Sequence, residues 1–185
     1  MEKDWTTQQV DTMPVIALRG LTIFPNVLIH FDVAREISIK ALEEAMTAGS
    51  PVFLVGQKDL AVEKPEAKDL YTVGTVSKVR QILRMPGDNV RVGALCRGNL
   101  EELKPTSPYL EAVVRTIPGE KAGHNSAKTE ALIRSTYEMF QQYTELAPKT
   151  APDLLINVLA SEDPGYIADF IAQNIAMRNS DKQAV

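Results

Sequence analysis

The spacing of the apolar residues changes near residue 118, and this change limits what the chain can fold into. Upstream, short apolar runs alternate with polar residues or stand between turn residues, as they do in strands. Downstream, apolar residues recur every three or four positions, as they do on one face of a helix. The pattern predicts an α+β chain with a polar tail at residues 1–12, a β-rich subdomain at 13–117 and a helical subdomain at 118–185.

The β-rich part contains several short strand-like runs around one helical run. The helical run covers residues 35–47, where apolar residues line one face before Gly49 and Pro51 end it. Many short β segments around a single helix favour a small antiparallel sheet that closes, or nearly closes, into a barrel-like form. The predicted strands cover residues 13–18, 27–33, 52–56 and 109–116, and the run VFLVG at 52–56 is apolar enough to be buried on both faces.

A β-hairpin is predicted within residues 70–95. Two strand-like runs flank the sequence PGDN at 86–89, whose residues suit a tight reversal. In the first run Val73 and Val76 fall on opposite parities, so both cannot lie on one face of a regular strand. We therefore expect a β-bulge or a strong twist in this strand.

The helical part begins with one long helix that carries two apolar stripes. One stripe consists of Ile133, Tyr137, Phe140 and Thr144, and a second stripe of Leu132, Met139, Tyr143 and Leu146 widens it. A stripe of this width predicts that the helix touches neighbours on more than one side.

Three further helix starts follow. Thr150 with Asp153 resembles one, and Asp163 places a capping side chain directly before a proline at the first helical position. The final residues, SDKQAV, resemble another start, in which Ser180 would cap and Gln183 would complete a capping box. Helices over about sixty residues bury one core only by packing together, so we expect a helical bundle.

Charge and cysteine content argue against several classes of function. The formal net charge is −4, with 20 basic and 24 acidic residues, which makes nucleic-acid binding unlikely but does not exclude a local basic patch. One cysteine, Cys96, and two histidines, His30 and His124, cannot supply an internal disulfide or a zinc site, so no metal is expected. No apolar run is long enough to span a membrane and the start does not resemble a signal peptide, so we expect a cytoplasmic protein without membrane association.

Catalytic motifs are absent from the sequence. It contains no GxxxxGK(S/T) phosphate loop and no GxGxxG, HExxH or GxSxG motif.

Cys96 precedes Arg97, which could lower a thiol pKa, but cysteines are so often buried that we interpret Cys96 as inert. Glu162 and Asp163 could form an acid and base pair, yet helix capping explains Asp163 sufficiently. His30, at an alternate strand position, is expected to face solvent or an internal hydrogen bond. A binding module is therefore favoured, and an enzyme with an unrecognised site in the barrel mouth is the weaker alternative.

Apolar residues stand at two predicted turns, where polar residues are usual. Ile23 and Phe24 come directly before Pro25, and Leu83 and Met85 stand beside the reversal of the hairpin. These side chains either fold inward and close the end of the sheet or form a surface that binds varied partners. We favour the inward position for Phe24. For Met85 the two positions are equally well supported.

Several motifs in order along the chain resemble the amino-terminal domain of Lon proteases. Residues 13–46, MPVIALRGLTIFPNVLIHFDVAREISIKALEEAM, are similar to its opening, in which a Pro-(Val/Leu)-x-x-Leu-Arg segment precedes a Phe-Pro turn and a helix that begins (Gly/Ala)-Arg-Glu-x-Ser. Residues 69–92 continue the resemblance, and residues 162–185 are similar to its Asp-Pro-(Gly/Ala)-x-(Leu/Ile)-Ala-Asp segment and Lys-Gln helix start. One segment departs from the pattern: residues 90–100, VRVGALCRGNL, lack the family's Val-Glu-Gly-(Leu/Tyr)-x-Arg run. The matching positions are Leu18, Arg19, Phe24, Pro25, Arg35, Glu36, Ser38, Ala41, Leu42, Leu70, Tyr71, Gly74, Thr75, Asp163, Pro164, Ala168, Asp169, Ile171 and Ala172.

This resemblance implies a function that composition and periodicity do not give. It implies the non-catalytic amino-terminal domain of an ATP-dependent serine protease, which recognises and holds unfolded or damaged polypeptides and supports hexamer assembly with other Lon subunits. In that family ATP and Mg bind to a separate ATPase module, so no cofactor is implied for this part. The family's Lys-Gln helix continues into a long arm, so the sequence looks like a piece of a longer protein. A stand-alone Lon-domain adaptor or binding protein without an ATPase is the alternative.

The same resemblance, with the apolar turns, gives the predicted binding site. Exposed apolar loops on a rigid β scaffold can accept unfolded segments with little demand on their sequence. The predicted substrate-binding residues are Pro25, Val27 and Leu28 in one loop and Leu83, Met85 and Pro86 at the hairpin end.

Overall fold

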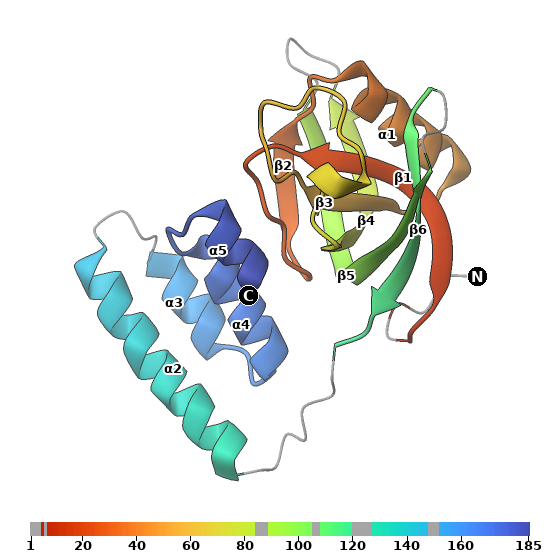
Figure 1. Cartoon of the computed structure of the whole chain (residues 1–185). Coiled ribbons are helices and arrows are strands. Elements are labelled where there is room, and N and C mark those ends of the chain that lie inside the picture. Colours follow the sequence, from red (N-terminus) through yellow and green to blue (C-terminus); the bar gives the residue numbers. More distant parts are fainter. Residues whose placement is uncertain (1–4, 6, 84–88, 105–107, 120–126, 148–151) are drawn as a thin grey trace. The chain divides into compact units, whose positions relative to one another are not determined.

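The structure is a computed structural model that describes residues 5, 7–83, 89–104, 108–119, 127–147 and 152–185 (Figure 1). Its contacts divide the chain into two compact units, Met1–Pro118 with Met177–Val185, and Gly119–Ala176. We call the first the sheet unit and the second the helical unit. Met177–Val185, which the sequence pattern grouped with the helices, makes its contacts with the sheet unit.

Six strands form one sheet in the sheet unit (Figure 1). Their order is β2-β5-β4-β3-β1-β6, and β5 also pairs with β6, so the sheet returns on itself. The strands predicted from apolar runs are all present, and the two arms of the predicted hairpin pair with each other. The strands are β1 Val10–Leu18, β2 Leu28–Asp32, β3 Val52–Gly56, β4 Val73–Leu83, β5 Asn89–Lys104 and β6 Leu110–Ile117.

The sheet is mixed, and the prediction of an antiparallel sheet was wrong for one pair of strands. β1 and β3 run parallel, with Val15 opposite Phe53, whereas the other pairings between these strands are antiparallel. Parallel neighbours need a crossover connection. Here the chain leaves β1, forms β2 and α1 (Glu36–Ala48), and returns beside β1 in the same direction. The alternation of apolar and polar residues within a strand does not determine whether the strand pairs in parallel or antiparallel with a strand that is distant in the sequence.

The pairing of β4 with β5 shifts its register twice. One shift lies between Val76 and Ser77, where the extra residue is Leu95 of β5, so the β-bulge predicted for β4 is confirmed at the second shift and not at the two valines. The other lies between Val79 and Gln81 and leaves Arg80 as the extra residue. The residues predicted to form the tight reversal, 86–88, lie outside the described residues.

Two clusters of buried side chains lie on opposite sides of β1 and β3. Leu54 and Ile16 belong to one cluster, and their neighbours Phe53 and Val15 belong to the other. Adjacent residues of a strand point to opposite faces, so both faces of these strands are covered, as the apolar run VFLVG predicted. The apolar face of α1 packs in the cluster that contains Leu54.

The predicted helix at 35–47 is confirmed as α1, Glu36–Ala48. It ends at Gly49, whose φ of 62° is left-handed, and the N–H groups of Gly49 and Ser50 donate to the last free carbonyls. Met46 was expected on the buried face but is about half exposed, because the buried face is narrower than the apolar stripe.

Three helices form the helical unit: α2 Ala127–Leu146, α3 Pro152–Leu159 and α4 Pro164–Asn174. They share a small core around Phe140, Val158 and Ile167. The predicted cap of α4 is confirmed, because Asp163 Oδ1 accepts hydrogen bonds from the N–H groups of Gly165 and Tyr166 at 2.9 and 3.3 Å. Thr150, predicted to start α3, lies outside the described residues.

The second apolar stripe of α2 is mostly uncovered. Tyr143 joins the core, but Leu132, Met139 and Leu146 are 59%, 64% and 83% exposed, so the expected contacts on that side are not formed by these residues. Among the helices of the described residues, none is long and apolar enough to span a membrane.

The final helix, α5 (Asn179–Ala184), begins differently from the prediction. Arg178 occupies the capping position without a side-chain bond to the helix backbone, and its Nε donates instead to Asp181 Oδ2 at 2.9 Å. Ser180 also donates to the Asp181 carboxylate. Gln183 does not complete a capping box, because its Nε2 donates to the carbonyl of Val73 in β4 at 2.8 Å. Gln183 therefore attaches α5 to the sheet unit.

Candidate functional site

The structure separates the three predicted residues of the first loop by their exposure. Pro25 is buried and Val27 is half-buried against the core, but Leu28, at the start of β2, is 52% exposed. Phe24 is 3% exposed, which confirms its interpretation as a core residue. Leu28 is thus the one residue of this predicted group that presents a large apolar surface.

The loop before β2 is held firmly on its inner side. Asn26 adopts a left-handed φ of 61°, and its N–H donates to the Ala94 carbonyl, while the Ala94 N–H donates to the Val27 carbonyl at 2.9 Å. Thr75 Oγ1 donates to the Ile23 carbonyl at 2.5 Å. These bonds tie the loop to β4 and β5, so the position of Leu28 is fixed by the sheet and not by the loop alone.

The second predicted group lies at the end of the β4–β5 hairpin. Met85 and Pro86 lie outside the described residues, and only the backbone of Leu83 is described. That backbone pairs with Asn89, which also pairs with Asp32 at the end of β2. The sheet therefore brings the strand that carries Leu28 and the strand end that carries Leu83 to opposite sides of β5.

Directly paired residues share a face of the sheet, and the face that carries Leu28 is basic. Leu28 is opposite Gly93, which is opposite Lys78, and His30 is opposite Arg91. We call this surface the β2–β5–β4 face, and it consists of Leu28, His30, Lys78, Arg80, Arg91 and Gly93.

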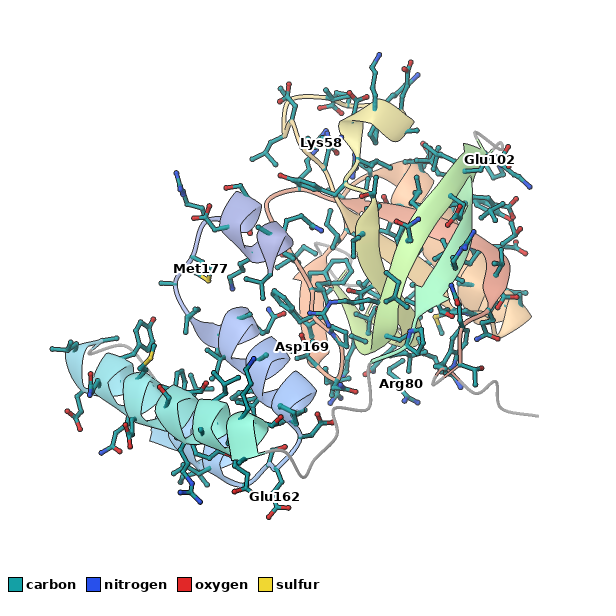
Figure 2. All side chains as sticks on the ribbon, turned by 60° about the horizontal axis from the view of Figure 1, so that its bottom comes forward. Lys58, Arg80, Glu102, Glu162, Asp169 and Met177 are labelled. Atoms are coloured by element: carbon teal, nitrogen blue, oxygen red, sulfur yellow. The ribbon has the colours of Figure 1, made fainter. Side chains whose placement is uncertain are left out.

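Arg80 joins this face through the register shift that it occupies. A Cβ atom placed on Gly93 would lie 3.3 Å from Arg80 Nε and 3.8 Å from Nη2, so the guanidinium lies over the glycine that pairs with Leu28. Figure 2 labels Arg80. This cluster was not among the residues predicted from the sequence. A usable signal was present, because Lys78 and Arg80 stand at alternate positions of the first hairpin arm and Arg91 stands near the start of the second, but their common face depends on the register of the two arms.

Two arginines of the resemblance motifs have structural partners. Arg35 donates to the carbonyl of Ala17 and to Gln57 Oε1, the latter at 3.2 Å, and Arg19 donates to the carbonyl of Val62 at 3.1 Å. Burial, with a smaller effect from nearby Arg19, lowers the pKa of the Arg35 guanidinium. These bonds join β1 to the segment after β3, so we assign both side chains to the scaffold.

Two of the residues weighed as catalytic lie on different strands of the described part of the chain, Cys96 on β5 and His30 on β2. Cys96 is 7% exposed, and burial raises the pKa of its thiol to about 11, so it is protonated near neutral pH and inert, as predicted. His30 is exposed on β2, also as predicted, and His124 lies outside the described residues. Within the described residues, no group of histidine, cysteine, aspartate and glutamate side chains could hold a metal ion.

Comparison with known proteins identifies related sequences. Residues 12–185 match the family model described as the ATP-dependent protease La (LON) substrate-binding domain. Lon protease of Desulforamulus reducens is 36% identical over 96% of this chain, that of Clostridioides difficile is 36% identical over 100%, and that of Brevibacillus choshinensis is 37% identical over 94%. The chain spans only 22%, 24% and 22% of the lengths of these relatives.

Solved structures support the fold. The N-terminal domain of the Mycobacterium avium complex Lon protease superposes with a TM-score of 0.76 at 16% identity, covering 94% of this chain and 88% of that one. A Lon N-terminal domain protein from Xanthomonas campestris gives a TM-score of 0.55 at 12% identity, covering 83% and 92%. At these identities the likeness concerns the fold alone.

Proposed function

Because this chain belongs to the family of Lon substrate-binding domains, we propose that it recognises and holds unfolded or damaged polypeptides for a Lon-type ATP-dependent protease. The family gives it a substrate-binding role, and no catalytic domain is recognised in it. With the family, we propose a cytoplasmic location and a contribution to hexamer assembly with other Lon subunits. ATP and Mg would then act in other parts of the assembled protease.

The observation that carries this proposal is the exposed Leu28 on a rigid strand. Its neighbours Ile29 and Phe31 pack against the core, and the turn before it is bonded to β5. A leucine held in this way loses little further entropy when it binds, and it gains apolar contact that a folded protein does not offer, because folded proteins bury such side chains.

The other predicted residues have distinct parts in this proposal. Pro25 and Val27 would shape and support the loop from its buried side, and Leu28 would contact the bound polypeptide. Leu83, Met85 and Pro86 would extend the apolar surface at the hairpin end. Individual sites of this kind bind weakly, and six copies in a hexamer would raise the avidity.

A titration followed by NMR tests the proposal. We expect a permanently unfolded, apolar-rich polypeptide to shift the resonances of β2 and of the hairpin end, and the same protein in its native fold to shift none. Leu28→Asp should weaken binding several-fold or more, because it removes apolar contact at the centre of the surface.

Leu60 provides the matched control. It is 54% exposed in the same unit but lies outside β2, β4 and β5, so Leu60→Asp should bind the unfolded polypeptide as the wild type does. An equal loss of binding in the two variants would show that exposed leucines act without a defined site. If the unfolded polypeptide did not bind to the wild type, the isolated chain would not recognise substrates, and hexamer assembly would be its role.

A further inference from the structure

The β2–β5–β4 face places cations beside the exposed leucine in a chain that is acidic as a whole. The formal net charge is −4, yet this face carries Arg80 and Arg91 around Leu28 and Gly93. Lys78 stands in the same row, but it has interactions of its own within the chain, so the inference rests on the two arginines. Asp32 lies two positions beyond His30 on β2, at the edge of this face, and its Oδ1 accepts a hydrogen bond from Asn89 Nδ2 at 2.9 Å.

Neither arginine is neutralised by the described part of the chain. Among its ion pairs none involves Arg80 or Arg91. Arg91 Nε is buried and has no hydrogen-bond partner among the described residues. A guanidinium has five N–H donors in a planar fork that matches a carboxylate. Arg80 is exposed and Arg91 is half-buried, so their accessible N–H groups, and not the buried Arg91 Nε, are the donors that a carboxylate can reach.

From these contacts we infer that the β2–β5–β4 face selects extended polypeptide segments in which an apolar side chain is followed closely by aspartate or glutamate. This inference rests on the proposed function and names the substrate class of the same site. The apolar side chain would pack on Leu28, beside the Arg80 guanidinium that lies over Gly93. The carboxylates would meet the guanidinium groups of Arg80 and Arg91.

The spacing of the sheet sets the spacing of the recognised residues. Neighbouring strands lie about 4.8 Å apart, and alternate residues of a strand lie about 7 Å apart. The Arg80 guanidinium lies over Gly93, opposite Leu28, and Arg91 lies opposite His30, two positions along β2. In an extended segment, residues two positions apart face the same way at about 7 Å. For a segment that runs in the same direction as β2, the fitting pattern is therefore an apolar residue, any residue, and then an acidic residue.

A polypeptide fits this face better than a nucleic acid does. Nucleic-acid affinity depends on many lysines and arginines that neutralise successive phosphates, and here two guanidinium groups flank an exposed leucine. The leucine contributes to binding only when the ligand offers an apolar group. A polypeptide that carries both apolar and acidic side chains can satisfy the leucine and the two arginines together.

Three unfolded peptides of equal length test the inference. They carry the same apolar residues, each followed two positions later by glutamate, glutamine or lysine. At low ionic strength we expect the wild type to bind the glutamate peptide several-fold to about tenfold more tightly than the glutamine peptide, and the lysine peptide least tightly. The preference should shrink at high salt, because these charges are exposed.

The double variant R80Q/R91Q should bind the glutamate and glutamine peptides equally. The control double variant K64Q/R134Q makes the same change of net charge at exposed positions outside this face, and it should keep the preference. Equal wild-type affinity for the glutamate and glutamine peptides would overturn the inference while leaving the proposed function intact. Failure of the wild type to bind any of the three would overturn both. Tighter binding of single-stranded oligothymidylate than of the glutamate peptide, lost in R80Q/R91Q, would instead assign the face to phosphate.

Discussion

Gly74 is a residue whose identity is set by close packing between neighbouring strands. A Cβ atom at this position would lie 2.5 Å from the Leu54 carbonyl oxygen and 2.7 Å from Phe53 Cζ. Since both neighbours are part of the buried sheet, they cannot move aside easily. We expect Gly74→Ala to lower the free energy of unfolding by about 1–3 kcal/mol in urea titrations. Gly119→Ala is the control, because no atom of the described residues lies within 4 Å of its Cβ position, and a similar loss there would contradict this explanation.

Cys96 makes the stability depend on alkaline pH. Burial raises the pKa of its thiol from the ordinary value of 9.0 to about 11, so the thiol ionises first in the unfolded chain. Ionisation then favours unfolding increasingly as the pH rises from 9 to about 11. Thermal unfolding should show a steeper fall in Tm over this range for the wild type than for Cys96→Ala. Parallel curves for the two proteins would mean that the thiol is not desolvated in the fold.

At the scale of elements, α5 depends on one long-range hydrogen bond. Gln183 Nε2 donates to the Val73 carbonyl at 2.8 Å, and the two residues are 110 positions apart in the sequence. Gln183→Ala should weaken the docking of α5 by about 1 kcal/mol and speed amide hydrogen exchange in Asn179–Ala184 several-fold. Ser180→Ala should leave exchange unchanged, because Ser180 does not cap the helix. Faster exchange in Ser180→Ala than in Gln183→Ala would instead support the capping role that the sequence predicted for Ser180.

Sequence patterns could predict elements that depend on near neighbours in the chain. The parity conflict of Val73 and Val76 predicted a bulge, and Asp163 before Pro164 predicted a cap, because each depends on residues a few positions apart. The parallel pairing of β1 with β3 could not be predicted, since it depends on the path of a long crossover. The site shows the same limit. Leu28 was found from its place at a turn, whereas the cluster of Arg80 and Arg91 requires the register of three strands.

At the scale of the whole molecule, the two units have separate cores of unequal size. The sheet unit has two large clusters of buried hydrophobic side chains, while the one cluster of the helical unit has three buried members among the described residues, Phe140, Val158 and Ile167. Stability scales with the apolar surface that folding buries. The helical unit should therefore be the less stable of the two and should unfold first.

Phe140→Ala tests this difference, because it empties the centre of the smaller core. The substitution of a buried phenylalanine by alanine costs about 3–5 kcal/mol, which is comparable to the whole stability that a core of this size can provide. We expect NMR spectra in which resonances of the helical unit collapse while those of the sheet unit keep their native dispersion. Met139→Ala is the matched control at the adjacent position, since Met139 is 64% exposed and should leave both sets of resonances unchanged. If Phe140→Ala abolished the dispersion of both units together, the chain would fold as one cooperative body, and the sheet unit would need the helices in order to present its binding face.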